Sequence, residues 1–284
     1  MKQTIGRSGI IGAFFVFLSL SNERRALSIE CKNIHHPSPS IRHNMHHKTQ
    51  AIVLSNAKYN DKFSITHVFT RDFGRVSYLL PKTHGKRSKI NPALFSPLSI
   101  LNLEVEHLPL REIQRLKEAG RQTLLYDIGS DLTKVSLAFF LSEFLSKVLR
   151  ETHNNEVLFD FLKNSIEVLE ETQSGLANFH LTFMLGLTRF LGIYPNLENY
   201  TKGCCFDMLN GEFIFGIPAH NYYLRNRESA YLNELSRINF SNMHLYKMSR
   251  SDRNLIIERL LTYYRLHLYD FPAIKSLDVL RELF

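Results

Sequence analysis

Hydrophobic and polar residues alternate in short runs through the first part of the folded chain. Residues 101–106 read LNLEVE, an alternation that places one face of a strand on a core and the other in water. Residues 51–54 are continuously apolar, and two β-rich runs at 64–70 and 75–80 are separated by a turn. Residues 112–119 fit either a fifth strand or the first turns of a helix. Four or five short strands predict a small antiparallel barrel or a half-open sheet, with the OB-fold among the candidates.

The apolar positions recur at helical spacing in the second half of the chain. Ser130 is expected to cap the first helix, whose apolar face extends through Leu149. Two further helices are predicted over residues 155–171 and 176–193. Another helix is predicted to start at the capping pair Ser249 and Asp252, and a last one follows Ser276. His180 lies on the most apolar of these helices, so we expect a core histidine rather than a catalytic base.

A β-hairpin insert is predicted between two of the helices, at residues 203–218. Gly211 provides its turn, because glycine readily adopts positive φ. Asp207 and Glu212 flank this turn and are expected to be solvated.

The predicted fold class is α+β, a small antiparallel barrel followed by an all-α domain. The domains are an N-terminal extension at residues 1–47, either mis-annotated or disordered, a barrel at 48–126, and a helical domain at 127–284 with its insert at about 200–226.

The N-terminal extension raises the question of the start codon. Lys2 and Arg7 precede an apolar run at residues 9–20, which resembles the start of a secretory signal. The run is too short to span a bilayer and lacks a clear small-x-small cleavage site. Met45, directly before the first strand, is therefore the predicted start. If Met1 is the true start, an exported protein is the alternative.

Charge and cysteine content narrow the function classes. The chain has 284 residues and a net charge of +8, but residues 45–126 carry 13 basic and 6 acidic side chains, whereas residues 127–284 carry 16 and 19. This sign reversal suggests that the first domain meets an anionic partner. Three cysteines, Cys31, Cys204 and Cys205, exclude a disulfide framework and a four-cysteine metal site, and indicate a reducing compartment.

Motifs for catalysis are missing from the folded part of the sequence. A Walker loop is excluded because residue 80 is leucine where the motif needs glycine, five positions before Gly85. The signatures of serine hydrolases, zinc proteases and dinucleotide-binding enzymes do not occur either. An enzyme is therefore the least favoured interpretation.

A cluster of basic side chains is the feature of the sequence that indicates a function. The cations are Lys82, Lys86, Arg87 and Lys89 in a loop without acidic residues, with Arg71 and Arg75 around the preceding turn. Such a loop could follow a phosphate backbone while bases stack on the nearby Phe73, Tyr78 and Phe95. The alternative is a solvated loop beside aromatic side chains that belong to the core.

The order of these features resembles a known family, the RecO proteins of bacterial DNA repair and recombination. The similarity rests on AIVL at 51–54, FTRDFGRV at 69–76, the basic loop, and LFSPL at 94–98 ahead of the strand at 101–106. It extends over residues 49–284 and includes the insert.

The resemblance implies an OB-fold barrel and a role without catalysis. The expected activities are binding of single- and double-stranded DNA, annealing of complementary strands, and help in loading recombinase onto DNA coated by single-strand-binding protein. The implied partners are RecR and the acidic C-terminal tail of single-strand-binding protein, with RecF as a further candidate, in the cytoplasm with the nucleoid and not at a membrane. The implied DNA-binding residues are Arg71, Arg75, Lys82, Lys86, Arg87 and Lys89.

The sequence departs from the family pattern at the insert, where many relatives bind zinc through four cysteines. Only Cys204 and Cys205 are present here, so no zinc and no other cofactor is expected. This matches the Bacteroides-like branch of the family. The alternative to the DNA repair function is an OB-like module that binds RNA or protein.

Overall fold

The computed structural model describes residues 46–83, 89–150 and 153–284. The predicted start at Met45, and the extension before it, lie outside the described residues.

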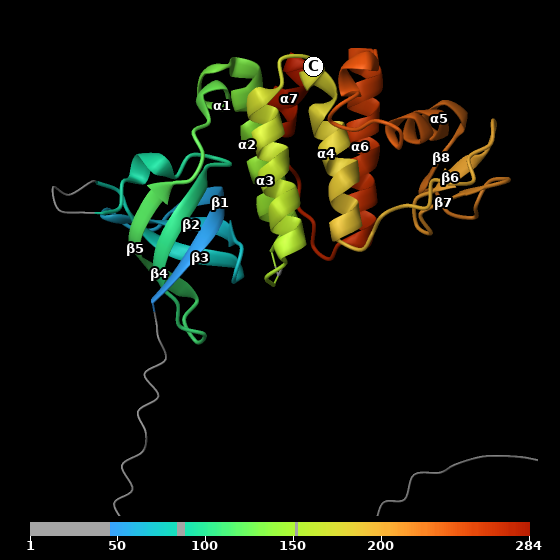
Figure 1. Ribbon diagram of the computed structural model, residues 1–284. Helices are drawn as coiled ribbons and strands as arrows, with labels where there is room; N and C mark the ends of the chain where they lie inside the picture. Colours follow the sequence, from blue (N-terminus) through green and yellow to red (C-terminus); the bar gives the residue numbers. More distant parts are fainter. Residues whose placement is uncertain (1–45, 84–88, 151–152) are drawn as a thin grey trace, which may run out of the picture. The chain divides into compact units, whose positions relative to one another are not determined.

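Five strands form a closed barrel, drawn in blue to green in Figure 1. The strands are β1 (His46–Lys58), β2 (Phe63–Thr70), β3 (Gly74–Pro81), β4 (Ile100–Glu106) and β5 (Ile113–Arg121). Their order around the barrel is β1-β2-β3-β5-β4, and the pair β3–β5 is parallel whereas the other pairs are antiparallel. The predicted barrel is confirmed.

The ambiguous segment at residues 112–119 is a strand with a β-bulge. Glu104 lies opposite Glu118, but Val105 lies opposite Leu116, so β5 holds one extra residue, Lys117. A bulge of this kind changes the side on which the following residues point. It therefore explains why Leu116 and Ala119 are both buried although they are three positions apart.

Strand β1 is buried on both faces. Ala51 and Val53 belong to the core inside the barrel, whereas Ile52 and Leu54 belong to the core formed by the helices. Neighbouring side chains of a strand point to opposite faces, so a strand covered on both sides needs a continuous apolar run. The hydroxyl of Ser142 also donates to the Leu54 carbonyl, which fixes the strand to the first long helix.

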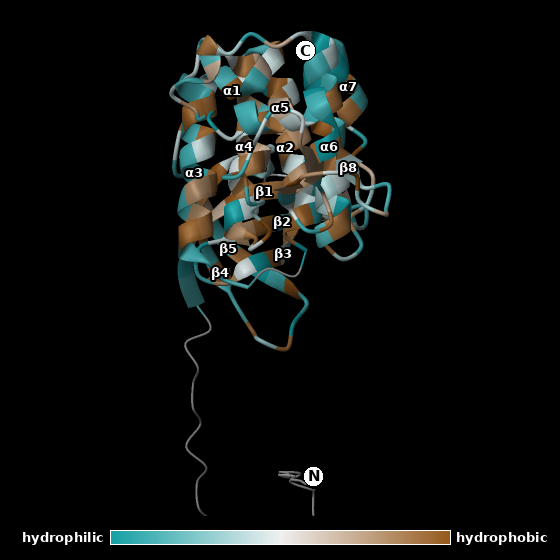
Figure 2. Cartoon of the chain, turned by 90° about the vertical axis from the view of Figure 1, so that its right-hand side faces the viewer, coloured by the Kyte–Doolittle hydropathy of each residue, from teal (hydrophilic) through white to brown (hydrophobic). Residues whose placement is uncertain are grey.

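The helical part contains seven α-helices among the described residues. They are α1 (Tyr126–Ser130), α2 (Leu132–Val148), α3 (Glu156–Glu171), α4 (Leu176–Phe190), α5 (Asn226–Leu235), α6 (Arg250–His267) and α7 (Leu277–Leu283). Helix α4 contacts α2, α3 and α6, which run alongside it in Figure 1 and explain its almost wholly apolar sequence. Figure 2 shows hydrophobic and hydrophilic positions together on the other helices, as expected for amphipathic elements.

The predicted start of the first long helix was wrong by one residue. Ser130 ends the short helix α1, and Asp131 caps α2 by accepting a hydrogen bond from the Lys134 amide at 2.9 Å. Serine and aspartate are about equally good caps, so the choice between adjacent candidates depends on the backbone turn that α1 introduces. The predicted cap Ser249 is confirmed, and Asn155, where the sequence predicted the next helix to start, caps α3.

The insert is a small three-stranded sheet. It consists of β6 (Cys205–Asp207), β7 (Glu212–Ile214) and β8 (Tyr223–Leu224) in the order β7-β6-β8. Gly211 has a φ of 70° at the turn, which confirms its predicted role. Strand β8 and helix α5 were not predicted.

None of the helices in the described ranges is both long enough and apolar enough to cross a membrane.

Candidate nucleic-acid interface

The structure places three of the six predicted DNA-binding cations, Arg71, Arg75 and Lys82, at opposite ends of the hairpin formed by β2 and β3. Arg71 and Arg75 lie where Thr70 pairs with Gly74, whereas Lys82 follows the other end, where Phe63 pairs with Pro81. Eight-residue strands separate the two ends by roughly 23 Å at about 3.3 Å per residue. Lys86 and Arg87 lie outside the described residues.

Arg71 is held by two carboxylates of helix α3. Its Nη1 donates to Asp160 Oδ1 at 2.6 Å, and its Nη2 donates to Asp160 Oδ2 at 3.2 Å and to Glu156 Oε2 at 3.1 Å. The hydrogen bonds to Asp160 and Glu156 raise the pKa of Arg71. Its guanidinium also lies over the ring of Phe159, 5.8 Å from the centroid. Arg71 is therefore engaged within the protein.

Arg75 is directed at the C-terminal end of α2. Its Nη1 donates to the Ser146 carbonyl at 2.7 Å, one of the last carbonyls of that helix, where a cation is favoured. Burial lowers the pKa of Arg75, and the charge of Arg150 adds to this effect. Lys89 is exposed but paired with Glu118, with 2.7 Å between Nζ and Oε2.

A set of exposed groups gathers around Lys82 instead. The Lys82 amide donates to the Lys62 carbonyl at 2.9 Å, so these two residues are neighbours. Lys58, Tyr59 and Lys62 form the end of β1 and its turn into β2, and all are exposed. None of the three lysines makes an ion pair with another residue that the structure describes. We call Lys58, Tyr59, Lys62 and Lys82 the basic hairpin edge.

The turn that builds this edge was missed in the sequence, although its signal is present. The Asn60 side chain accepts hydrogen bonds from the amides of Lys62 and Phe63, at 3.0 and 2.8 Å. Asparagine often forms such turns between strands. The turn brings Lys62 next to Lys82, which is 20 positions away in the sequence. The remaining charge at this turn is that of Asp61, which is exposed.

The aromatic side chains, like the cations, fall into a group engaged within the protein and a group exposed to solvent. Tyr78 and Phe95, which the sequence offered for base stacking, are 0% and 2% exposed and belong to the barrel core. Phe73 is covered by rings on two sides, with centroids 5.3 Å from His47 and 4.1 Å from His107. Tyr59, by contrast, is 56% exposed and lies within the basic hairpin edge.

A groove lies over β1, β4 and β5 of the barrel. Its charged lining residues are Lys48, Arg71, Asp72, Glu104 and Glu118. Two cations and three carboxylates give this groove a negative balance, so its charge does not favour a polyanion. On charge and exposure, the basic hairpin edge is the better candidate for nucleic acid.

Asp207 forms the centre of the insert, and the expectation that it is solvated was wrong. It is 3% exposed, and its carboxylate accepts hydrogen bonds from the amides of Leu209 and Asn210, the Asn210 side chain and the His220 ring. Burial acts to raise its pKa, but these hydrogen bonds outweigh burial and hold the pKa below its usual value. The turn buries Asp207 because its backbone amides need an acceptor.

The two cysteines of the insert are buried and free. Within the described ranges, no group of three or more His, Cys, Asp or Glu side chains is placed to hold a metal ion.

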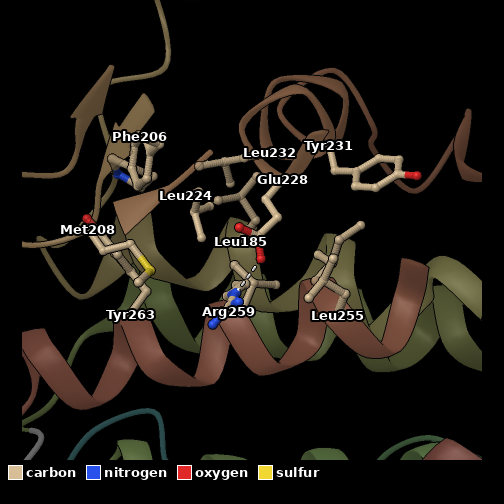
Figure 3. Close-up of a pocket in the computed structure, with 13 residues that line it drawn as sticks. Leu185, Phe206, Met208, Leu224, Glu228, Tyr231, Leu232, Leu255, Arg259 and Tyr263 are labelled. Carbon is tan, nitrogen blue, oxygen red and sulfur yellow. Dashed lines mark hydrogen bonds and ion pairs between the residues drawn. The ribbon is translucent and has the colours of Figure 1, made fainter. Parts of the chain in front are cut away.

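An apolar pocket lies where the insert packs on α5 and α6 (Figure 3). Phe206 and Met208 approach from the sheet, and Leu224 and Leu232 cover α6. The charged pair in its lining is Glu228 with Arg259, whose Oε1 and Nε are 2.7 Å apart. Because these charges compensate each other, the pocket offers no net charge to a ligand.

A second helical groove carries uncompensated positive charge. We call it the two-arginine groove; its lining includes Arg189 and Arg237, the apolar Phe161, Leu185, Ile238 and Phe240, and no acidic residue. Arg189 lies over the ring of Tyr194 at 4.5 Å and donates to its hydroxyl at 3.0 Å. This combination suits a ligand with a carboxylate and an apolar side chain.

Two family models match the chain. "Recombination protein O N terminal" matches residues 45–121, and "Recombination protein O C terminal" matches residues 129–278. The first covers the barrel, and the second covers the helices with the insert.

Curated relatives cover the same region. The chain is 44% identical over 237 residues to DNA repair protein RecO of Phocaeicola vulgatus. This alignment covers 84% of this chain and 98% of the relative. It is 42% identical to the RecO of Bacteroides fragilis over 238 residues, and 40% identical to that of Porphyromonas gingivalis over 240, each covering 98% of the relative. The resemblance seen in the sequence is confirmed: the chain belongs to the RecO family of DNA repair proteins.

Proposed function

We propose that this protein is a recombination mediator that binds DNA, anneals complementary strands and helps to load recombinase onto single strands coated by single-strand-binding protein. The observation that carries the proposal is the basic hairpin edge, which presents three exposed lysines and an exposed tyrosine on the barrel of a DNA repair family member. Two further cations, Lys86 and Arg87, follow Lys82 closely in the sequence.

The proposed mechanism is electrostatic rather than covalent. Two complementary strands repel each other, and side-chain cations lower this repulsion by displacing condensed counterions. Exposed lysines that have no carboxylate partner can do this without first breaking an ion pair. No bond of the DNA changes, so no catalytic residue is required. The proposed place of action is the cytoplasm, with the nucleoid.

The first prediction concerns the lysines of the edge. Changing Lys58, Lys62 and Lys82 together to Ala should weaken binding of labelled single-stranded DNA and flatten its salt dependence. The log–log slope should fall by about 2, at roughly 0.7 per lost phosphate contact. Fluorescence anisotropy across a salt series measures both quantities.

The matched control removes three exposed lysines of the helical part, Lys202, Lys247 and Lys275. Both triple variants lose the same charge. Equal slopes for the two variants would show that only net charge matters, and would contradict a site at the edge.

The second prediction concerns Tyr59. Replacing it by Ala should weaken binding of single-stranded DNA roughly fivefold or more, because stacking on one aromatic ring contributes about 1–3 kcal/mol per base. The salt slope should stay unchanged, since no cation is lost. The Phe variant should retain wild-type affinity. A loss with Phe as large as with Ala would assign the effect to the hydroxyl and not to stacking.

Competition decides between this function and an RNA-binding module. If RNA of the same sequence displaces the DNA more strongly than unlabelled DNA does, the RNA-binding alternative is favoured.

We further propose that the two-arginine groove holds the acidic C-terminal tail of single-strand-binding protein. Two arginines and several apolar side chains line this groove, with no acidic residue among the described lining residues, and such a lining complements a peptide that ends in a carboxylate. RecR and RecF remain proposed partners whose contact surfaces we do not assign.

The third prediction tests this groove with a labelled peptide that has the sequence of that tail. Changing Arg189 and Arg237 to Ala should reduce its affinity at least tenfold, as measured by anisotropy, and leave DNA binding by the barrel unchanged. The control changes Arg265 and Lys202, which are exposed elsewhere on the helical part. Undiminished peptide binding by the Arg189/Arg237 variant would place the tail at another surface.

We also propose that the insert is stable without zinc. The Asp207 carboxylate accepts hydrogen bonds from the amides of the turn and so holds the turn in place, as a bound metal would otherwise do. The fourth prediction is that Asp207→Ala lowers the free energy of unfolding by about 1–3 kcal/mol, because it removes a buried acceptor shared by two backbone amides and the Asn210 side chain. Since the pKa of Asp207 is lowered in the folded state, its contribution is present at neutral pH and is lost as the pH falls through that lowered value. Urea denaturation at several pH values measures this.

Glu212→Gln, at the exposed side of the same turn, should change stability little. A chelator should leave the melting temperature of the wild type unchanged. A clear decrease on chelation would contradict the zinc-free proposal.

A further inference from the structure

Arg71 has two environments within reach of its guanidinium. Its forked contact with Asp160 and its bond to Glu156 face helix α3. The same residue lines the groove over β1, β4 and β5. Its side chain is 32% exposed, and the carboxylates are more exposed still, at 53% and 65%. The contact is thus open to solvent and accessible to a competing anion.

The two carboxylates provide Arg71 with acceptor oxygens and negative charge, as a phosphate would. A guanidinium binds carboxylates and phosphates through the same pair of parallel N–H donors. Asp160 accepts from both Nη1 and Nη2, which is the forked geometry, and Glu156 adds a second negative charge. A phosphate can therefore replace them at Arg71 without a change in the kind of hydrogen bond.

We propose that Asp160 and Glu156 compete with DNA phosphates for Arg71 and thereby set the affinity of the barrel for DNA. This inference rests on the proposed DNA-binding function. The carboxylates act as an internal competitor: Arg71 contributes to DNA binding only to the extent that a phosphate displaces them.

The distance from the basic hairpin edge is compatible with one continuous strand. The two ends of the β2–β3 hairpin are roughly 23 Å apart, the length of about seven nucleotides at the duplex rise of 3.4 Å and of fewer nucleotides in an extended single strand. OB-folds bind about 4–16 nucleotides. A strand that starts at Tyr59 and Lys82 can therefore reach Arg71.

The ion pair can be opened without separating the barrel from the helices. Phe69, fully buried, stacks on Phe159 with centroids 6.4 Å apart, and Ile52 and Leu54 are buried among the helices. Each buried apolar side chain contributes about 1.5–3 kcal/mol, whereas exposed ion pairs contribute little. The apolar packing, not the ion pair, holds this contact together.

The test compares two variants with the same change in charge. Asp160→Asn removes the forked partner of Arg71. Glu171→Gln removes an exposed carboxylate at the end of the same helix, about 16 Å further along it, which makes no ion pair with any residue in the described ranges. Affinity for labelled single-stranded DNA is measured by anisotropy at low salt, and thermal unfolding of each variant checks the fold.

Asp160→Asn should bind DNA roughly two- to fivefold more tightly than the wild type, in line with the small energies of exposed ion pairs, and Glu171→Gln should differ much less. Asp160→Glu, which keeps the charge, should bind like the wild type. Adding Arg71→Ala to Asp160→Asn should abolish the gain, whereas Arg71→Ala alone should change affinity little. Such non-additivity identifies a direct coupling between the two residues.

Equal gains in Asp160→Asn and Glu171→Gln would overturn the inference, because they would reveal only long-range electrostatics. A gain that persists without Arg71 would overturn it as well. If the wild type binds DNA and Asp160→Asn binds no more tightly, the inference fails while the proposed function stands. If no variant binds DNA at low salt, both fail.

Discussion

The burial of β1 and β2 on both faces is the constraint on which the rest of the structure depends. One set of their side chains, including Val53 and Val68, fills the barrel, and the alternate set, including Ile52 and Phe69, fills the helical core. Since strand side chains alternate strictly, one choice of register satisfies both cores. A shift by one residue would exchange the two sets and place small residues against the helices. The packing of the barrel core and the packing of the helical core therefore depend on the same strand register.

This register also decides which cations are available to a ligand. Arg71 follows Phe69 by two positions, and Arg75 is the partner of Phe69 across the hairpin, so both arginines lie on the side of the helices. They meet Asp160 and the end of α2 for the same reason that Phe69 meets Phe159. At the other end of the hairpin, no carboxylate of a described helix pairs with the lysines. The apolar packing thus determines which cations are paired and which are exposed.

The sequence predicted the fold well because the signals are local. The alternation in β4, the cap at Ser249 and the glycine turn of the insert all depend on neighbouring residues. The distribution of the cations depends on contacts between distant segments, such as Arg71 with α3 or Lys62 with Lys82, and composition does not record these. The burial of Asp207 was missed for a related reason, since a carboxylate beside a turn is exposed unless the turn folds over it. The sequence shows that Arg71 lies two positions after Phe69 and therefore on the same face of the strand. This spacing could not place Arg71 beside the helices until the structure showed that Phe69 faces them.

The annealing function that we propose requires the protein to hold DNA firmly enough to gather it and loosely enough to release the duplex. Unpaired lysines at a hairpin edge give the first property, because each phosphate they neutralise releases counterions. Cations already paired with carboxylates give the second, because every phosphate they bind must first displace an internal anion. Arg71 and Lys89 are of this paired kind, whereas Lys58, Lys62 and Lys82 make no ion pair with any residue that the structure describes. Under the proposed function, the positive charge of the barrel therefore overstates its attraction for DNA, and the arrangement of carboxylates around each cation, rather than the net charge, sets how strongly DNA would be held.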